Sequence, residues 1–453
     1  MSSRNRNGYN EFASRFEHSS RDNHSAPDGG EWLGGICLSG KAVQTSLTNL
    51  RKLIVHKQRL TGKFPTGGTK EDILSVMRDV AYIQWDPVNV VAPAHIISLW
   101  SRIGKFNPSD LEKLLWEDKR VFEHYTPVLM LMLTEEYPIF YSLMKRYPKS
   151  LRGSWGSHSE HAQKFLSENR DLQKRILKEL EDGPLSLDKL TDYTPSNRSA
   201  DGWSSDSKVS NMMFHLHMLG KVMIVGHHKN QNVWGLSDDF LPEWVERKLL
   251  TENAADRAAA TRALKSMGPA TLGEINYYFV RGRYHDLERA LSGLEKEKEI
   301  TRLRIEDIGR REERYILSKD IPLLESMDDI DFVPRISLLS PFDNMISGRN
   351  RTSRVFGFEY ILEQFVPREK RRYGTYVLPI LWGERLIGRI DPRMDREENI
   401  LKINAVHKEP GADIPVEAIE EIGTRIEELG LFLGADGAKY TSKIPPQWKG
   451  RLN

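Results

Sequence analysis

Hydrophobic positions first recur at helical spacing shortly after residue 45. Leucine and isoleucine fall three and four residues apart over residues 47–54, which predicts an amphipathic helix. A second helix is expected after the Pro65–Gly68 turn, with Thr69 as its N-cap. A third begins at Asn107-Pro108, a capping side chain followed by proline at the first helical position. We therefore place a first helical domain at residues 44–158.

Two later segments resemble copies of one unit. Residues 183–190 (Gly-Pro-Leu-Ser-Leu-Asp-Lys-Leu) are echoed by residues 268–275 (Gly-Pro-Ala-Thr-Leu-Gly-Glu-Ile), 85 positions on, and the endings 233–237 and 314–318 align at an offset of 81. Between start and end each copy shows a helical pattern and then a β-hairpin, the parts of a winged helix. Two unrelated α+β subdomains are the alternative, but matched starts and ends favour a repeat. The predicted winged-helix domains span residues 159–245 and 246–330, with 44–158 as a divergent first copy.

After Pro334 the pattern changes to alternating, strand-like positions. Tyr376–Trp382 and Leu386–Ile390 flank a Gly383-Glu384 turn and predict a hairpin, with a further strand at Ile400–Val406. A helical pattern follows over Pro415–Leu431. Residues 331–453 are thus expected to form a β-rich domain with one helix, and the fold class is α+β.

Composition narrows the classes of protein. The 453 residues suggest about three domains at roughly 100–200 residues each, and a hydrophobic content of 39% can supply their cores. Residues 1–43 are polar and aperiodic, which predicts a disordered tail. There is no apolar run long enough to span a membrane and no apolar signal core, so a cytoplasmic, nucleoid-associated location is expected. A single cysteine, Cys37, excludes an internal disulfide and a cysteine-based zinc site.

Charge is balanced overall but not locally. The chain carries 66 Lys and Arg against 64 Asp and Glu, a net charge of +2, whereas residues 349–372 hold seven basic side chains against three acidic ones. Such a segment is either a solvated face or a surface for a polyanion, and a protein built of winged helices favours phosphate binding. The residues expected to contact DNA phosphates here are Arg349, Arg351, Arg354, Arg371 and Arg372.

The segment Gln84-Trp85-Asp86-Pro87 is the best candidate for chemistry. Proline disfavours helical geometry at Asp86, so the chain should be extended and Gln84 and Asp86 should share one face. An amide and a carboxylate side by side can hold one water between them. The alternative is structural: Asp86 and Asn89 cap the following turn. Pattern alone leaves both open.

Gln84-Trp85-Asp86 is similar to the Gln-x-Asp signature of the winged-helix DNA glycosylases for alkylated bases and interstrand crosslinks, the AlkZ/YcaQ-like family. The resemblance covers roughly residues 45–410. Its further motifs are Val88-Asn89-Val90-Val91, Ala94-His95, Leu99-Trp100-Ser101-Arg102, Phe122-Glu123, Leu338–Asn344, Arg349, Arg351-Thr352, Phe356-Gly357-Phe358, Glu363, Val366-Pro367, Lys370–Gly374, Val377-Leu378-Pro379 and Gly388–Asp391. Two departures are Pro93, where the family often has arginine, and His124-Tyr125-Thr126-Pro127, where it has an aromatic pair followed by histidine.

The resemblance implies three winged helices in a C-shaped clamp and a barrel-like C-terminal domain. It also implies a monomeric glycosylase without lyase activity, acting on N7-alkylguanine and on crosslinks in double-stranded DNA, with no metal or other cofactor. Gln84 and Asp86 would lie at the lesion. Further expected DNA contacts, from the family motifs, the second recognition helix and the tip of the second wing, are Asn89, His95, Arg102, His124, Tyr125, Trp203, Lys208, His228, Lys229 and Asn230. The wing tip could equally be a solvated turn.

The implied chemistry is consistent with these residue types. An N7-alkylated guanine is cationic, so its glycosidic bond can break without a general acid. A carboxylate such as Asp86 could stabilise the oxocarbenium-like sugar and activate water, while Gln84 positions that water. The main rival hypothesis is a transcriptional regulator that uses the same winged helices without chemistry.

Overall fold

The structure, a computed structural model, describes residues 42–452 apart from residues 66, 127, 150–155, 191–204, 229–230, 307–311, 329–331 and 442. The fold is mixed α+β, as expected, with three small sheets of three strands and one sheet of five strands in the described residues. Residues 1–41 of the tail expected at 1–43, and Trp203, Lys229 and Asn230, lie outside the described part. The end of that expected tail is wrong, because Val43 begins strand β1 (Val43–Thr45) and pairs with Leu303.

The first region packs helices against the sheet β2-β4-β3. Two N-caps predicted from sequence are confirmed: the Thr69 side chain accepts from the Asp72 amide in a capping box, and the Asn107 side chain accepts from the Ser109 amide. Its elements are α2 (Leu47–Lys57), α3 (Lys70–Val80), β2 (Tyr82–Gln84), α4 (Ala94–Ile103), α5 (Pro108–Trp116), β3 (Val121–Tyr125), β4 (Leu129–Leu133) and α6 (Tyr137–Arg146).

The second and third regions pair their strands in equivalent ways. Leu185 pairs with Trp234 in one, and Ala270 pairs with Tyr315 in the other. These pairs are related by the offsets of 85 and 81 found in the sequence, so the repeat extends to strand pairing. The second region has α7 (Gly156–Glu168), α8 (Arg170–Glu179), β5 (Leu185–Ser186), α9 (Ser205–Met218), β6 (Val222–His228), β7 (Gln231–Leu236) and α10 (Ser237–Phe240). The third has α11 (Glu252–Met267), α12 (Leu272–Tyr278), α13 (Leu287–Lys296), β8 (Ile300–Ile305), β9 (Arg314–Leu317) and α14 (Ile321–Glu325).

A strand from the start of the described chain completes the third sheet. β1 (Val43–Thr45) pairs in parallel with β8, although more than 250 residues separate them. The N-terminal end of the first region is therefore held against the third.

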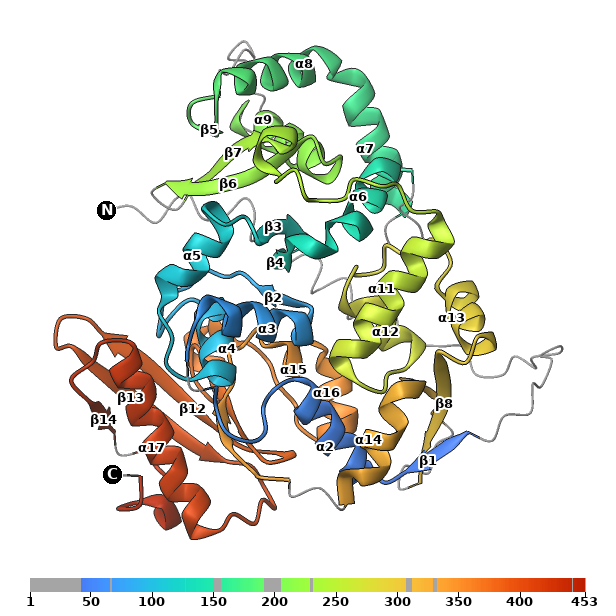
Figure 1. The fold of residues 1–453 in the computed structure, drawn as a ribbon. Helices are drawn as coiled ribbons and strands as arrows, with labels where there is room; N and C mark the ends of the chain where they lie inside the picture. Colours follow the sequence, from blue (N-terminus) through green and yellow to red (C-terminus); the bar gives the residue numbers. More distant parts are fainter. Residues whose placement is uncertain are drawn as a thin grey trace.

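The C-terminal region is an open sheet. Its strands are ordered β10-β11-β12-β13-β14, so within the described residues β10 and β14 are edges and no closed barrel forms. The barrel-like expectation is thus not confirmed: β14 pairs with β13 and not with β10, while α17 packs on the sheet in Figure 1. The elements are β10 (Ile336–Leu338), α15 (Asn344–Ser347), α16 (Arg349–Phe356), β11 (Leu378–Trp382), β12 (Arg385–Asp395), β13 (Ile400–Lys408), α17 (Val416–Phe432) and β14 (Ala438–Tyr440).

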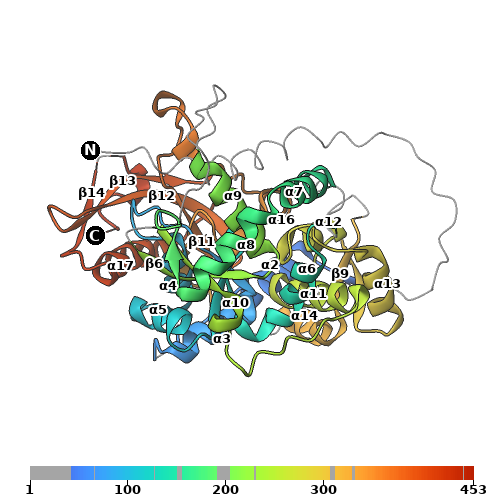
Figure 2. The ribbon, with the colours of Figure 1, turned by 90° about the horizontal axis from the view of Figure 1, so that it is seen from above.

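The first region lies at the centre of the molecule. In Figure 1 it has the C-terminal sheet and α17 on one side, α11 and α12 on the other, and β6 and β7 above it. Seen from above in Figure 2, α17 and α13 mark opposite ends of the molecule. One hydrophobic core joins α3 and α4 to the C-terminal sheet, and a second joins β3 and β4 to α11 and α12. The segment after β2 therefore sits where the other three regions converge on the first.

Candidate active site

Gln84 is the last residue of β2, as the predicted extended chain requires, and Asp86 follows two positions beyond the end of the strand. Gln84 pairs with Met130 of β4, and the Trp85 amide donates to the carbonyl of Leu129 at 2.9 Å. The Asp86 carbonyl then accepts from the Ala94 amide at 3.1 Å, which ties the segment to the start of α4. Both ends of the motif are thus held by backbone hydrogen bonds.

The ring of Trp85 is sandwiched between two histidines. It stacks on His95 with ring centroids 5.8 Å apart and on His227 with centroids 4.9 Å apart, and both ring pairs are nearly parallel. Trp116 meets His227 edge-on at 5.6 Å. The indole of Trp85 is therefore covered on both of its faces.

Asp86 is a partly buried carboxyl group with one free oxygen. The Val88 amide donates to Oδ1 at 2.9 Å, so Asp86 does cap the next turn, as the structural alternative held. Oδ2 has no hydrogen-bond partner in the described residues, nor has the amide of Gln84. Burial raises the pKa of Asp86 to about 6, and the bond from Val88 offsets part of that shift. Capping and chemistry are therefore compatible, because they use different oxygens.

The C-terminal region contributes a neighbour to this carboxylate. Tyr376 is fully buried just before β11, and its phenol pKa is raised by burial and then by the negative charge of Asp86. Tyr376 also belongs to the hydrophobic core against which Trp85 and Val88 pack.

A partly buried hydrogen bond holds His227, one histidine of the sandwich. His227 lies in β6, and its Nε2 is 2.9 Å from Oε1 of Glu123 in β3. Glu123 is fully buried, and its Oε2 has no partner in the described residues. His227 directly precedes the contacts expected at the tip of the second wing; it pairs with Asn232 within the hairpin and stacks on Trp85. The second region therefore contacts the motif through His227, which packs on the ring of Trp85.

His124 is buried in a chain of hydrogen bonds that links three regions. Nδ1 of His217 lies 3.2 Å from the Val222 carbonyl, so this nitrogen carries the proton and Nε2 accepts from His124 Nδ1 at 2.9 Å. His124 Nε2 in turn accepts from Arg283 at 3.4 Å. Burial, followed by the neighbouring positive groups, holds the pKa of His124 well below its usual range, so the ring is neutral. A DNA contact by His124 is not supported, because the ring has no surface to offer.

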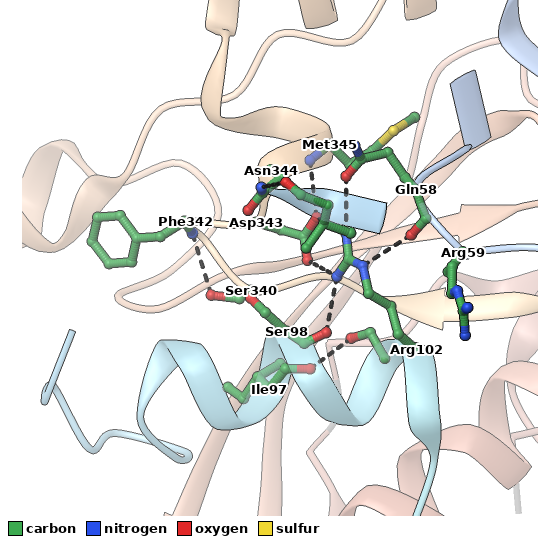
Figure 3. Close-up of polar contacts among 12 residues, drawn as sticks. Gln58, Arg59, Ile97, Ser98, Arg102, Ser340, Phe342, Asp343, Asn344 and Met345 are labelled. Atoms are coloured by element: carbon green, nitrogen blue, oxygen red, sulfur yellow. Dashed lines mark hydrogen bonds and ion pairs between the residues drawn. The ribbon is translucent and has the colours of Figure 1, made fainter. Parts of the chain in front are cut away.

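Among the other expected contacts, Arg102 has an internal partner. Figure 3 shows its guanidinium against Asp343, to which it donates at 2.6 and 2.8 Å, with further bonds to the carbonyls of Gln58 and Ser98. Asp343 also accepts from the Met345 amide and so caps the start of α15. The Arg102 side chain is almost fully buried, and a phosphate contact is not supported.

The basic segment divides into buried and exposed side chains. Arg351 is buried, with its guanidinium on Glu274 and on the carbonyls of Pro269 and Met267. Arg349 donates to the carbonyls of Ile346 and Pro341, and Arg371 to those of Val366 and Gln364. Arg354 and Arg372 are exposed, although Arg354 is paired with Glu312. Of the five arginines expected to contact phosphate, Arg354 and Arg372 are therefore the two that are exposed to solvent.

The remaining expected contacts are spread over several elements. Lys208 on α9 and His228 at the end of β6 are exposed. Asn89 is exposed too, but its Oδ1 accepts from Arg396 at 2.6 Å. The hydroxyl of half-buried Tyr125 lies 3.4 Å from Asn232 Nδ2, and His95 is buried in the sandwich described above.

Sequence reasoning missed four side chains around the motif. Glu123, His217, Arg283 and Tyr376 each act on a residue at least 90 positions away. Of these four, Glu123 alone stood within a family motif, whereas His217 is a buried, hydrogen-bonded residue that no motif marked. Among the described residues, no three His, Cys, Asp or Glu side chains gather as a metal site would require. Within the same residues, no helix is long and apolar enough to cross a membrane.

Comparisons with known proteins identify the family and the fold. A family model described as "DNA glycosylase AlkZ-like" matches residues 77–432. Among solved structures, the DNA glycosylase AlkZ of Streptomyces sahachiroi is similar, with a TM-score of 0.61 and 16% sequence identity over 88% of this chain and 100% of that one. At that identity the structural match speaks for the fold alone. The family model, however, spans well over half of the sequence, and the chain belongs to the AlkZ-like family of DNA glycosylases.

Proposed function

We propose that this DNA repair glycosylase hydrolyses the N-glycosidic bond of alkylated purines, N7-alkylguanine above all, and unhooks interstrand crosslinks of the same chemistry. The observation that carries the proposal is the Asp86 carboxyl group, which is partly buried, has one oxygen free and has a pKa of about 6. Such a group is ionised at neutral pH and is still basic enough to accept a proton, the compromise that general base catalysis favours.

The reaction needs no acid on the leaving base. In an N7-alkylated guanine the ring is cationic, so the electrons of the C1′–N9 bond pass to N9 and neutralise it. The ionised Asp86 stabilises the positive charge that develops on the sugar. Water held by the Gln84 amide adds to C1′ and gives a proton to Asp86, which leaves an abasic site and a neutral free base.

The surroundings support a motif that is held in place before substrate binds. Trp85 is fixed between His95 and His227, and the Glu123 carboxylate fixes His227 in turn. Groups positioned by such packing need less rearrangement as the bond breaks. No lysine is required, so we expect hydrolysis without a Schiff base and hence no lyase activity.

We propose that double-stranded DNA binds a monomer along the three helix-and-hairpin regions, which we interpret as winged helices at residues 44–158, 159–245 and 246–330. Their DNA-facing side chains would be the exposed members of the expected set, together with those outside the described residues. The exposed ones are Asn89, Lys208, His228, Arg354 and Arg372. A nucleoid-associated, cytoplasmic location follows from that substrate.

The test is excision from a duplex that carries one N7-methylguanine. Wild type should produce abasic sites, Asp86→Asn should lower the single-turnover rate by about 10²–10⁴, and Gln84→Ala should lower it less. Asp286→Asn is a matched control, because the Asp286 side chain also accepts a backbone amide, that of Arg289, but it caps α13 in the third region.

Two other results would change the assignment. A product trapped on the protein by borohydride would overturn the hydrolytic mechanism. Tight binding to one undamaged sequence without abasic product would instead make the protein a winged-helix regulator.

A further inference from the structure

Two large apolar side chains stand exposed on the segment between α16 and β11. Phe365 is 62% exposed and Ile361 is 57% exposed; among the described residues, only Leu431 is a large hydrophobic residue with a greater exposed fraction, at 63%. Phe365 ends a short 3₁₀ turn, Glu363–Phe365, and a second such turn follows at Arg368–Lys370. We call residues 361–373 the apolar-basic loop.

The apolar-basic loop is firmly fastened at its base. The buried Glu363 carboxylate accepts backbone N–H groups from Arg372, Tyr373 and Gly374 at 2.7–3.0 Å. The Arg371 guanidinium donates to the carbonyls of Gln364 and Val366 at 3.2 and 2.8 Å. Exposed apolar groups on a base held this well are not fraying ends, and exposed apolar surface of this kind marks an interaction site.

The aromatic side chains on the inner face of this segment also stay in place. Phe358 and Tyr360 are buried, and the Tyr360 hydroxyl donates to the Val377 carbonyl at 2.6 Å. The Arg389 guanidinium lies between the rings of Phe358 and Tyr373, 4.1 Å from each centroid. Aromatic residues are thus buried on the inside while Ile361 and Phe365 face outward.

The charges around the two apolar side chains are mostly positive. Arg368, Lys370 and Arg372 are exposed in the apolar-basic loop, where Glu369 is the one exposed acid. A protein partner with an apolar pocket would not need these basic side chains. A polyanion that also offers flat apolar surfaces would bind both the basic and the apolar side chains of the loop. Duplex DNA, with phosphates outside and base stacks within, has this chemistry.

The base of the loop also joins the hydrophobic core on which the Gln84–Asp86 motif packs. Gly374, whose amide is bound by Glu363, is two residues from Tyr376, a distance of at most about 7 Å along the chain. Tyr376 belongs to the buried core against which Trp85 and Val88, the residues on either side of Asp86 and Pro87, pack. The base of the loop and the Gln84–Asp86 motif therefore belong to one neighbourhood of the fold.

We propose that Phe365, supported by Ile361, is a wedge that inserts into the base stack of duplex DNA beside the lesion, while Arg368, Lys370 and Arg372 bind the flanking phosphates. The inference rests on the proposed function, since it takes duplex DNA as the substrate. Insertion unstacks the neighbouring base pair and bends the duplex, which exposes the sugar of the damaged nucleotide.

The test uses binding, so that it does not depend on catalysis. The probe is a duplex with a tetrahydrofuran abasic analogue next to 2-aminopurine, whose fluorescence rises when it is unstacked. Wild type should raise the fluorescence on binding. Phe365→Ala should remove most of that rise and weaken affinity about 5- to 150-fold, the range for a lost base–aromatic stack, without changing the salt dependence. Phe365→Leu should restore the rise, because an aliphatic wedge also inserts.

Two further variants separate the parts of the proposal. Replacing Arg368, Lys370 and Arg372 together by glutamine should lower the slope of log affinity against log salt by about 2.7, at 0.9 per phosphate contact, and keep the fluorescence rise at saturation. Leu431→Ala removes an equally exposed side chain from α17 and should behave as wild type.

The wedge is refuted if Phe365→Ala binds this duplex as tightly as wild type and gives the same fluorescence. That result would point to a different partner for the exposed side chains, such as a protein. Failure of wild type to release N7-methylguanine would refute the proposed function instead, and the fluorescence outcome would still decide the wedge.

Discussion

Replacing Asp86 by asparagine should stabilise the protein while it removes activity. In the folded protein the pKa of Asp86 is raised from 3.8 to about 6, mainly by burial. Each pKa unit corresponds to 1.36 kcal/mol, so keeping this carboxylate ionised in the fold costs about 3 kcal/mol relative to the unfolded chain. Asparagine carries no charge, and its Oδ1 can still accept from the Val88 amide.

The sign of the pH dependence follows from the raised pKa. The folded state holds the Asp86 proton more tightly, so its contribution to stability is complete below pH 3.8 and is lost as pH rises through about 6. The difference in the free energy of unfolding between Asp86→Asn and wild type should therefore be close to zero near pH 4. It should grow to as much as about 3 kcal/mol at pH 8.

Equilibrium denaturation of both proteins across this pH range measures the difference directly. Asp343→Asn is the control of opposite sign, because it leaves the buried Arg102 charge without its partner and should destabilise by about 3–5 kcal/mol at pH 8. The reasoning fails if Asp86→Asn is less stable than wild type at pH 8, or if its advantage is the same at pH 4.

Three further predictions concern the pH dependence, the arginines and the sandwich. The value of kcat/KM for excision should rise with pH, reach half its maximum near pH 6 and level off at higher pH, as Asp86 ionises. The residual activity of Asp86→Asn should lack this rise with pH. Arg102→Ala should destabilise the protein by about 3–5 kcal/mol and leave the salt dependence of DNA binding unchanged. Arg372→Ala should change stability by no more than about 0.5 kcal/mol and lower the slope of log affinity against log salt by about 0.9. Equal slopes for the two variants would contradict the assignment of Arg102 to the buried core and of Arg372 to the DNA-binding surface. His227→Ala should slow excision and destabilise by about 1–3 kcal/mol, because it strips Glu123 of its hydrogen bond; His227→Gln, which can still donate, should recover most of the stability in a thermal melt.

Local structure near the motif could be predicted from sequence because it depends on neighbouring residues. Thr69 and Asn107 cap their helices through side chains that reach amides two or three positions on. The extended path through Gln84 and Asp86 follows in the same way from the proline at position 87. Matched residues at offsets of 85 and 81 also predicted equivalent hairpins, since equal local patterns form equal local structures.

Tertiary structure determined which charged and aromatic side chains are buried and which are exposed. Arg102 and Arg372 are both arginines within family motifs, yet one is buried against Asp343 and the other is exposed. Whether an arginine can bind phosphate depends on an acid 241 positions away, and no local pattern records that distance.

The same division applies to the site and to the C-terminal sheet. Sequence could place Gln84 and Asp86 on one face, but only the assembled fold brings His227 onto Trp85 and Tyr376 near Asp86. The strands after Pro334 were predictable from alternation, whereas the open edge between β10 and β14 was not. Periodicity and capping act over a few residues, so they determine which helices and strands form. Closure of the sheet, burial of a side chain and a raised pKa depend on which distant elements pack together, because desolvation and charge pairing arise only in the packed protein.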